Sequence, residues 1–432
     1  MPSRARLSSA YREFDGLPTG WTTRRLGEIC TESQYGLNPS PGEGEEYPLL
    51  RMNNLQAGKI DTSDLVQVRL SRKDAEKYRL HPGDLLVNRT NSSDLVGKTA
   101  LFNLPGDYVF ASYLVRFRLD EEEAVPEYVN YYCNSHYGKH AMQRLATKGV
   151  SQANINPTEL KKWFMVPLPP LIEQRKIAEI LGTWDQAIEL TERLIEAKRR
   201  RKKGLMQQLL TGKRRFKEFE GQEWREVRLG EVAEIRASTV DKKTLPNEVA
   251  VRLCNYMDAY ENDYITDGLV FMEATATAKE VGRYALRRGD VVVTKDSETR
   301  EDIAAAAVVD DDIPNLLCGY HLAIVRPRRG EVDGGFLAQA LGQNPAHSHF
   351  ARHANGAIRY GLTISSLSSA PLSLPPLAEQ QAIVGVLRAR DHETDLLNRK
   401  LALLREQKKG LMQQLLTGKV RVKGQTQYYR EG

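Results

Sequence analysis

A twelve-residue segment, KKGLMQQLLTGK, occurs twice in the sequence, at Lys202–Lys213 and again 206 positions later at Lys408–Lys419. The two copies close a longer match without gaps, which pairs residues 168–213 with residues 374–419. Solenoid repeats have periods of roughly 20 to 50 residues, far shorter than this one. The chain is therefore expected to fold from two copies of a whole module.

Weaker similarities precede each copy at nearly the same offset. WTTRRLGEI at Trp21 resembles WREVRLGEV at Trp224, and HPGDLLV at His81 resembles RRGDVVV at Arg287. The order is domain, helix, domain, helix. We predict a first globular domain at 1–166, a helix at 167–213, a second globular domain at 214–372, a helix at 373–419 and a C-terminal tail at 420–432.

Each matched segment has the periodicity of a long helix with one apolar seam. Steps of four and three residues connect apolar positions in both copies, as in a coiled coil. In both segments the helix is expected to begin after a Pro-Pro pair and to end at Thr-Gly, where Gly212 and Gly418 suit C-terminal caps. A helix of about 40 residues would be roughly 60 Å long. The seam residues that we expect to pair the helices, or to bind a partner, are Ile177, Leu181, Ile188, Leu205, Leu209, Ile383, Leu387, Leu401, Leu411 and Leu415.

Connectivity predicts the direction of this pairing. The first helix leads from domain one to domain two, and the second starts at domain two. Short connections are obtained if the two helices pack antiparallel. The globular domains read as mixed α+β, because strand-like runs such as DLLVN and DVVVTK lie between turn residues, with helical stretches at PEYVNYYCNSHYGKHAMQRLA and GGFLAQALGQNPAHSHFARHA.

Composition limits the class of protein. The chain has 432 residues, of which 41% are hydrophobic and 27% are charged, which is typical of a folded chain with two or three domains. Neither an apolar signal-peptide core nor a run of about 18 apolar residues is present, so we expect a cytoplasmic protein without a membrane span. The formal charge of +6 permits a polyanionic partner. Four scattered cysteines are expected to be reduced and mostly buried.

The order of modules, the PLPPLIEQRKIAEIL and LPPLAEQQAIVGVL segments that open the helices, and the KKGLMQQLLTGK segments that close them resemble the specificity (S) subunit of Type I restriction-modification systems. The resemblance implies two target recognition domains that each read one half of a split, asymmetric site in double-stranded DNA. It also implies that the helices set the gap between the halves and dock two modification (methyltransferase) subunits, which restriction subunits join. S-adenosylmethionine, Mg²⁺ and ATP would then belong to these partners, and this chain would hold no cofactor.

Comparison of the two halves adds to this interpretation. The globular domains have diverged, which predicts two different half-sites, whereas the helix ends are identical, which predicts two equivalent surfaces for copies of one partner. Base edges are read mainly by Arg, Lys, Asn, Gln, Ser and Thr side chains. The polar loops of domain one supply the candidates Asn88, Arg89, Thr90, Asn91, Ser92, Lys98, Lys148, Ser151, Gln152 and Asn154. The corresponding loops of domain two supply Lys295, Ser297, Thr299, Arg300, Arg359 and Tyr360. The alternative interpretation is that these are ordinary turn residues.

Other polar features have more than one interpretation. Arg51 and Arg252 occupy matching positions, which suits a phosphate contact or a structural hydrogen bond better than base reading. The basic run at Lys198–Lys203 suits a solvated helix face or a partner contact better than a DNA contact. Trp163 is expected in the core. A metal site at His347, His349 and His353 is not expected, because no Cys or carboxylate completes it.

Catalytic signatures are not recognised in the sequence. VGKT at Val96–Thr99 lacks the leading glycine of a P-loop, and neither a methyltransferase motif nor a nuclease carboxylate pair can be placed. We therefore expect a non-catalytic subunit that confers specificity on enzymes. The alternatives are a stand-alone DNA-binding scaffold or regulator of the same architecture, and a single-chain nuclease or methyltransferase.

Overall fold

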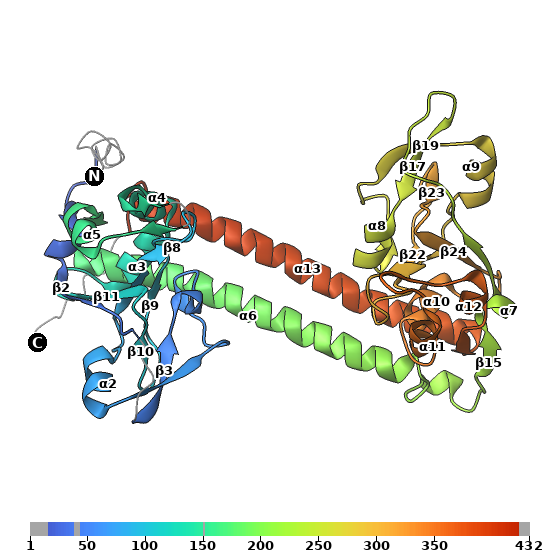
Figure 1. Cartoon of the computed structure of the whole chain (residues 1–432), viewed down its shortest axis with the longest axis horizontal. Coiled ribbons are helices and arrows are strands. Elements are labelled where there is room, and N and C mark those ends of the chain that lie inside the picture. The colour runs from blue at the N-terminus through green and yellow to red at the C-terminus, as the bar shows by residue number, and fades with distance from the viewer. Residues whose placement is uncertain (1–15, 39–43, 150–151, 423–432) are drawn as a thin grey trace, which may run out of the picture. The chain divides into compact units, whose positions relative to one another are not determined.

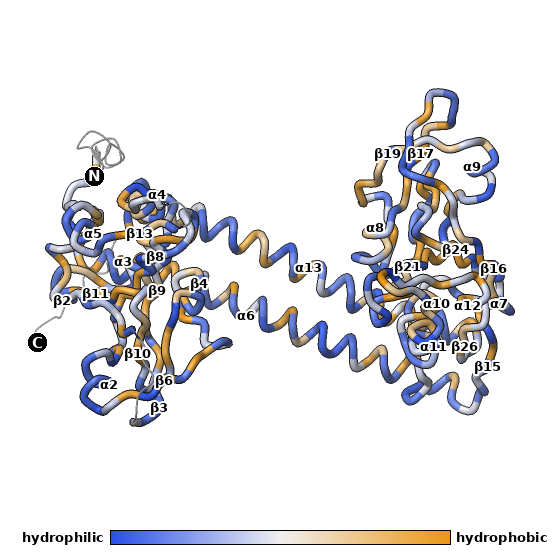
Figure 2. Tube along the Cα trace, viewed as in Figure 1, coloured by the Kyte–Doolittle hydropathy of each residue, from blue (hydrophilic) through white to orange (hydrophobic). Residues whose placement is uncertain are grey.

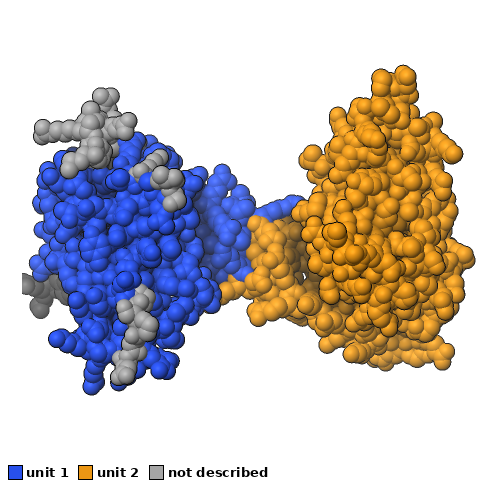
Figure 3. All heavy atoms as spheres, in the orientation of Figure 1, with its two compact units in different colours: residues 1–192, 399–432 blue, residues 193–398 orange. Residues whose placement is uncertain are grey.

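The structure is a computed structural model that describes residues 16–38, 44–149 and 152–422. It divides into two compact units, which Figure 3 shows in different colours. Unit 1 contains residues 1–192 and 399–432, and unit 2 contains residues 193–398. Each unit therefore combines one globular region with the start of one long helix and the end of the other.

The two long helices are α6 (Leu171–Leu209) and α13 (Leu377–Leu415), of 39 residues each. Apolar and polar residues alternate along both, as Figure 2 shows. Just after the helices, Gly212 (φ +68°) and Gly418 (φ +72°) adopt the left-handed conformation, which a side chain disfavours. The predicted helices and their glycine caps are confirmed.

Within each unit, the start of one helix lies beside the end of the other. The core of unit 1 contains Ile177 and Leu181 of α6 together with Leu415 and Leu416, which lie at the end of α13 and just after it. The core of unit 2 contains Ile383 and Leu387 of α13 together with Leu209 and Leu210 from the end of α6. Each fully buried Leu or Ile contributes about 1.5 to 3 kcal/mol to stability. The predicted antiparallel pairing is therefore confirmed inside each unit.

The globular region of unit 1 is mixed α+β, as predicted (Figure 1). Its central sheet has the strand order β2 (Cys30–Tyr35), β11 (Leu114–Leu119), β7 (Leu85–Asn88) and β9 (Thr99–Leu101). A second sheet has the order β10 (Val109–Phe110), β3 (Glu45–Leu50) and β6 (Val66–Leu70), and two short pairs join β1 (Thr22–Arg25) to β14 (Met165–Leu168) and β4 (Leu55–Gln56) to β5 (Lys59–Ile60). The helices are α2 (Arg72–Tyr78), α3 (Pro126–Asn134), α4 (His136–Leu145) and α5 (Pro157–Trp163).

The globular region of unit 2 repeats this plan with differences. Its central sheet has the order β16 (Ala233–Ala237), β24 (Leu322–Pro327), β20 (Val291–Thr294), β22 (Ala306–Val309) and β18 (Tyr264–Ile265). A second sheet has the order β19 (Met272–Ala276), β17 (Val249–Cys254) and β23 (Leu316–Cys318), and β15 (Arg225–Arg228) pairs with β26 (Pro371–Leu374). The helices are α7 (Leu229–Val232), α8 (Tyr256–Glu261), α9 (Ala278–Tyr284), α10 (Gly334–Leu341), α11 (Ala346–His353) and α12 (Ile364–Ser368).

The cysteines fit the sequence prediction. Cys133, Cys254 and Cys318 are buried free thiols, and Cys30 is a half-buried one. Burial raises the pKa of the Cys133 and Cys318 thiols well above the ordinary value. Neither long helix, nor any shorter helix in the described part of the chain, is apolar enough over a sufficient length to span a bilayer.

Candidate nucleic-acid interface

Two candidate loops of unit 1 meet in one small antiparallel sheet. β8 (Thr90–Asn91) follows the central strand β7 and pairs with β13 (Ala153–Asn154), which also pairs with β12 (Thr147–Lys148). Loops about sixty residues apart in sequence are thus held side by side. Ser151 lies outside the described residues, and for Lys148 only the backbone position is described.

Unit 2 brings its two candidate loops together in the same way. β21 (Asp296–Ser297) follows the central strand β20 and pairs with β25 (Tyr360–Gly361). The backbone N–H of Leu362 also donates to the Lys295 carbonyl at 2.7 Å. Both units therefore carry a small polar sheet at the end of a central strand. We call it the platform; it consists of β8 and β13 with their adjoining loops in unit 1, and of β21 and β25 with theirs in unit 2.

The strand registers show which positions correspond between the two platforms. Thr90 pairs with Asn154 and Asn91 with Ala153, as Asp296 pairs with Gly361 and Ser297 with Tyr360. From these pairs, the corresponding positions are Arg89 and Lys295, Asn91 and Ser297, and Gln152 and Arg359. The first pair, Arg89 and Lys295, is basic in both units. In the other two pairs, the side chains of the two units differ in chemistry. This is the pattern expected if the first position contacts backbone phosphate and the others read different bases.

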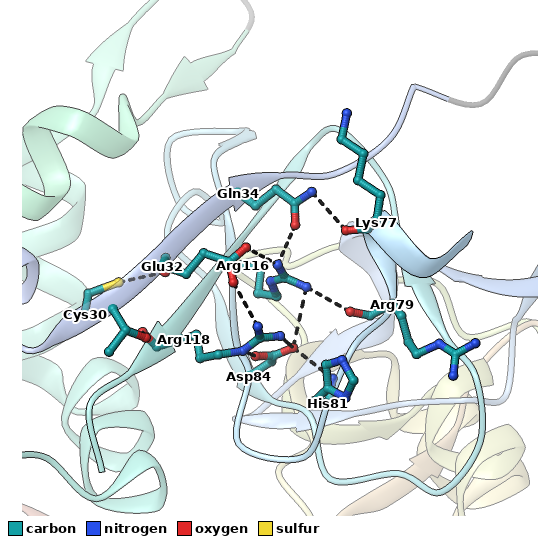
Figure 4. Close-up of polar contacts among 10 residues, drawn as sticks. Cys30, Glu32, Gln34, Lys77, Arg79, His81, Asp84, Arg116 and Arg118 are labelled. Carbon is teal, nitrogen blue, oxygen red and sulfur yellow. Dashed lines mark hydrogen bonds and ion pairs between the residues drawn. The ribbon is translucent and has the colours of Figure 1, made fainter. Parts of the chain in front are cut away.

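A buried carboxylate fixes the strand that leads to each platform. In unit 1, the Asp84 carboxylate accepts hydrogen bonds from Arg118 at 2.9 and 3.2 Å and from the His81 backbone N–H at 2.8 Å (Figure 4). In unit 2, Asp290 accepts bonds from Arg326 at 2.7 and 2.6 Å and from a backbone N–H. These bidentate pairs raise the pKa of both arginines. The aspartate of each Gly-Asp turn therefore has a structural role, because it fixes the turn and the neighbouring strand.

A second arginine, Arg116, stabilises the central sheet of unit 1 close to Asp84. Arg116 is 3% exposed, and its guanidinium donates to Glu32, to Gln34 and to the Arg79 carbonyl, so that it ties β2 to the loop after α2 (Figure 4). A buried guanidinium needs such partners, because an unpaired charge is costly to bury. In unit 2 the corresponding strand position is Ile324, which lies in the apolar core. The two central sheets thus stabilise their platforms partly by different means.

The candidate side chains of unit 1 differ in exposure. Arg89 is half-buried, with its guanidinium 5.1 Å from the centre of the Tyr35 ring and 3.4 Å from Asn154 Oδ1. Ser92, Gln152 and Asn154 are exposed, and Asn91 is half-buried. Lys98 Nζ donates to Gln56 Oε1 at 3.4 Å. An amide-rich, weakly basic surface results, and whether it contacts DNA stays a prediction.

The candidates of unit 2 include two arginines, each held near another side chain. Arg359 lies 3.1 Å from the Asp296 carboxylate, and the Arg300 guanidinium lies 5.0 Å from the centre of the Tyr360 ring. Thr299 Oγ1 donates to Asp302 Oδ2 at 2.8 Å and accepts from the Asp302 backbone N–H at 3.2 Å, so Thr299 is a turn residue here. Lys295 is half-buried.

Three of the candidate side chains are buried. Asn88 is fully buried, Ser297 is 3% exposed and Thr90 is 8% exposed. Asn88 Oδ1 accepts the Thr90 backbone N–H at 3.2 Å, and Ser297 Oγ accepts the Thr299 backbone N–H at 3.3 Å. The Asn88 and Ser297 side chains thus brace turns, and because all three side chains are enclosed, they are not included in the contacts that we propose.

The remaining polar features act within the protein. Arg51 pairs with Asp64 at 2.9 Å and Arg252 pairs with Asp267 at 2.9 Å, which favours the structural hydrogen bond over the phosphate contact. Trp163 packs against the core of unit 1 and donates to Glu159, as expected. Three histidines were considered as metal ligands, namely His347, His349 and His353. A ring nitrogen of each forms a hydrogen bond with a backbone carbonyl.

Exposed apolar side chains near the platforms were not predicted from the sequence. In unit 1, Tyr35 is 50% and Tyr113 is 48% exposed, and in unit 2 Tyr320 is 38% exposed. The Tyr113 carbonyl accepts the Arg89 backbone N–H at 3.0 Å, which places this residue beside the platform. A single sequence gives no signal for such residues, because an aromatic in a strand or turn reads as core.

Seven of the ten predicted seam residues are buried, and Ile188, Leu205 and Leu411 are half-buried. Leu209 and Leu415 are each 3% exposed, whereas Leu205 and Leu411 are half-buried and pack against the cores of units 2 and 1. Packing within the units therefore accounts for these leucines, and whether they also contact a partner stays a prediction. In the identical segments, the exposed side chains include Gln207 and Gln208 in unit 2 and Gln413 and Gln414 in unit 1.

A matched ionic clamp joins the helices to the globular region in each unit. In unit 1, Asp185 of α6 accepts from Tyr131 at 2.7 Å and pairs with Lys408 of α13 at 2.6 Å. In unit 2, Asp391 of α13 accepts from Tyr264 at 3.0 Å and pairs with Lys202 of α6. Burial and the neighbouring carboxylate raise the pKa of both tyrosines. Part of the basic run at Lys198–Lys203 is thus used inside the unit, since Lys198 also pairs with Glu393 of α13.

Comparison with known proteins agrees with this architecture. A family model described as "Type I restriction modification DNA specificity domain" matches the chain twice, over residues 18–198 and 221–406. The putative type I restriction enzyme MjaX specificity subunit of Methanocaldococcus jannaschii is 29% identical over 419 residues, which cover 95% of this chain and 96% of that protein.

Solved structures show the same fold at low identity. The Type-I restriction-modification system S subunit from M. genitalium aligns with a TM-score of 0.55 and 16% identity, over 93% of this chain and 96% of that one. A chain from a structural study of complex assembly in the type I R-M system aligns with a TM-score of 0.56 and 18% identity, over 94% of this chain and 100% of that one. With two matches of the family model that together span most of its length, the chain belongs to the Type I restriction-modification DNA specificity family.

Proposed function

We propose that this chain is the non-catalytic DNA-recognition subunit of a Type I restriction-modification complex. Each unit reads one half of a bipartite site in double-stranded DNA, and the long helices set the gap between the halves. The observation that carries the proposal is the pair of platforms, since the same scaffold is built twice and its exposed side chains differ. Two readers on one scaffold with different contact residues suit an asymmetric site.

The residues that we propose as DNA contacts are those left exposed or half-buried on the platforms. Arg89 and Lys295 would hold backbone phosphate in both units, because a basic residue is kept there although the neighbouring positions differ. The residues that would read bases in unit 1 are Asn91, Ser92, Gln152 and Asn154. In unit 2 they are Arg300, Arg359 and Tyr360. Lys98 would contribute to the affinity in unit 1 without selecting a base.

The identical helix ends fit a second role, docking of methyltransferase subunits. Packing explains the shared apolar residues of KKGLMQQLLTGK, but not why the exposed glutamines are also the same. Two equal surfaces, one in each unit, suit two copies of one partner. The partner subunits would bring the chemistry, with S-adenosylmethionine for methyl transfer and Mg²⁺ and ATP for the restriction subunits.

Mapping methylated adenines tests this function. Cells that express the chain with its methyltransferase subunit are compared with cells that lack only this chain. A bipartite motif with a fixed gap is expected to disappear when the chain is removed, and the purified chain alone should transfer no methyl groups. Replacing Gln152 by Ala should change one half of the motif and leave the other half unaltered. A continuous palindrome, or methyl transfer by the chain alone, would contradict the proposal.

A further inference from the structure

On the platform of unit 2, the guanidinium of Arg359 forms an ion pair with the Asp296 carboxylate, which His321 contacts in turn. Arg359 NH2 lies 3.1 Å from Asp296 Oδ1, and His321 Nδ1 lies 2.7 Å from Asp296 Oδ2. The side chains of Asp296 and His321 are 18% and 19% exposed, whereas that of Arg359 is 54% exposed. The supporting pair is therefore mostly enclosed, while the guanidinium faces outward.

The backbone around this group is fixed by the central sheet. Asp296 lies on β21, one residue beyond Lys295, whose N–H donates to the His321 carbonyl at 3.0 Å. Arg359 directly precedes β25, which pairs with β21. The three residues thus come from three segments that are bonded to one another. This ion pair, which lacks the geometry of a hydrogen bond, restrains the guanidinium before any partner binds, which lowers the entropy that binding must overcome.

The corresponding positions of unit 1 lack this arrangement. Thr90 stands at the position of Asp296, Gln152 at that of Arg359, and Tyr113 at that of His321, as the strand registers and the matching backbone hydrogen bonds indicate. None of these three side chains carries a charge at neutral pH. The ionic support is therefore specific to unit 2, which argues against a structural requirement of the scaffold.

The chemistry of an oriented guanidinium selects among bases. Two parallel N–H groups of Arg match the O6 and N7 acceptors of guanine in the major groove, whereas Asn and Gln amides match adenine. A phosphate contact needs only a positive charge, so it needs no carboxylate behind the arginine. A carboxylate beside the arginine in fact weakens the attraction of the site for phosphate, since like charges repel.

We propose that the half-site read by unit 2 contains a guanine that Arg359 contacts, with Asp296 and His321 as positioning residues. This inference rests on the proposed function. The uncharged side chains that replace this group in unit 1 predict that Arg359 has no counterpart in the other half-site. Guanine recognition by Arg359 thus accounts for part of the asymmetry between the two halves.

Selection from a randomised duplex library tests the inference. The full chain, in complex with the methyltransferase subunits that co-purify with it, is bound to the library, and the bound DNA is sequenced. For Arg359→Ala, the preference for one G·C pair should fall at least about fivefold, while the other half of the motif stays the same. Asp296→Asn should weaken the preference at the same pair at least about threefold, because the arginine remains but loses its orientation.

Two controls separate base reading from charge and from folding. Arg329→Ala removes the same charge from an exposed position of unit 2 and should leave the motif intact. Gln152→Ala changes the matched position of unit 1 and should alter only the other half of the motif. Thermal unfolding of each variant verifies that the unit is folded.

The outcomes distinguish this inference from the proposed function. A two-block motif in the wild-type complex supports the function in every case. If Arg359→Ala then lowers the affinity for all sequences equally, or affects a pair other than G·C, guanine recognition is overturned while the function stands. If Asp296→Asn leaves the preference unchanged, its positioning role is overturned. A wild-type complex that selects no two-block motif overturns both.

Discussion

Asp84 and Asp290 are buried residues that fix the strand leading to each platform, although neither lies on the platform surface. Each lies in the turn before a central strand and holds an arginine of the neighbouring strand through two hydrogen bonds. Each also accepts a backbone N–H of its own turn. The strand that ends at the platform is thus fixed at its start, so the exposed side chains are presented in one geometry.

Replacing Asp290 by Ala should therefore destabilise unit 2. Arg326, whose side chain is 22% exposed, would keep its charge but lose both bonds to the carboxylate. We expect a loss of about 2 to 3 kcal/mol in the free energy of unfolding, below the cost of breaking a fully buried pair because water reaches part of the guanidinium. Hydrogen exchange of peptides from residues 291–294 and 322–327 measures the loss.

Asp312→Ala is the control for Asp290→Ala. Asp312 is exposed, and its removal should change the same free energy by less than about 0.5 kcal/mol. Equal effects of the two substitutions would show that the bidentate pair contributes no more than a surface charge.

Sequence reasoning at the residue scale found the right loops but not the right side chains within them. Residue type alone made Asn88, Thr90 and Ser297 candidates, because polar side chains after a strand suit DNA contact. The structure buries them where β7 and β20 lead into β8 and β21, and the buried position differs between the units, since Thr90 and Ser297 do not correspond in register. The exposed Tyr35 and Tyr113 were missed for the opposite reason, because only the tertiary fold decides that these aromatics stay outside.

At the scale of elements, the identical helix ends are placed in unequal surroundings. The glycine that caps each segment is left-handed in both copies. A Cβ at Gly212 would lie 3.4 Å from the ring of Trp224, an ordinary contact, whereas a Cβ at Gly418 would lie 2.6 Å from Pro18 Cγ. The same substitution should thus have different costs in the two copies of one sequence.

Gly212→Ala should destabilise unit 2 by about 1 to 2 kcal/mol, the cost of a left-handed alanine. Gly418→Ala should destabilise unit 1 by about 1 kcal/mol more, because the proline ring must also move. Urea unfolding of both variants and of the wild type, followed by hydrogen exchange in each unit, measures the difference. Equal losses would mean that the chain near Pro18 yields without cost, and the wild type serves as the common reference.

The helices were the most predictable elements, because their signals are local and repeated. A Pro-Pro start, an apolar seam and a Gly cap all occur twice at one offset, and both helices form within the predicted ranges. The clamps Asp185–Lys408 and Asp391–Lys202 could not be predicted in the same way. They depend on which turns of the two helices lie opposite each other, and seam periodicity does not fix that register.

At the scale of the whole molecule, each unit is assembled from distant parts of the chain. Unit 1 contains most of the N-terminal half and also residues 399–432. From that C-terminal segment, Leu415 and Leu416 enter the core of unit 1, and Arg421 donates two hydrogen bonds of 2.8 Å to Glu173. In unit 2 the matching bonds join Arg215, just after α6, to Glu379 of α13. The end of the chain therefore completes the unit that the N-terminal half begins.

A chain that stops at residue 398 should accordingly lose stability in its N-terminal unit. The deletion removes Leu415 and Leu416 from the core that contains Ile177 and Leu181, and Lys408 from Asp185, and it uncovers apolar surface in unit 1. Exposing several buried leucines costs about 1.5 to 3 kcal/mol for each, enough to unfold a marginally stable unit. Unit 2, which comprises residues 193–398, keeps all its residues.

Hydrogen exchange of the truncated and full-length chains tests this expectation. Amides of β7 and β11 should lose protection, whereas amides of β20 and β24 should keep theirs. Arg421→Ala in the full-length chain is the graded control, because it removes only the bonds to Glu173 and to the Thr19 carbonyl and should weaken unit 1 less than the deletion. If the deletion instead unfolds the adjacent residues of unit 2, the unit boundaries are wrong. Loss confined to unit 1 would show that the C-terminal end of the chain stabilises the first reader, so that binding at one half-site depends on both ends of the sequence.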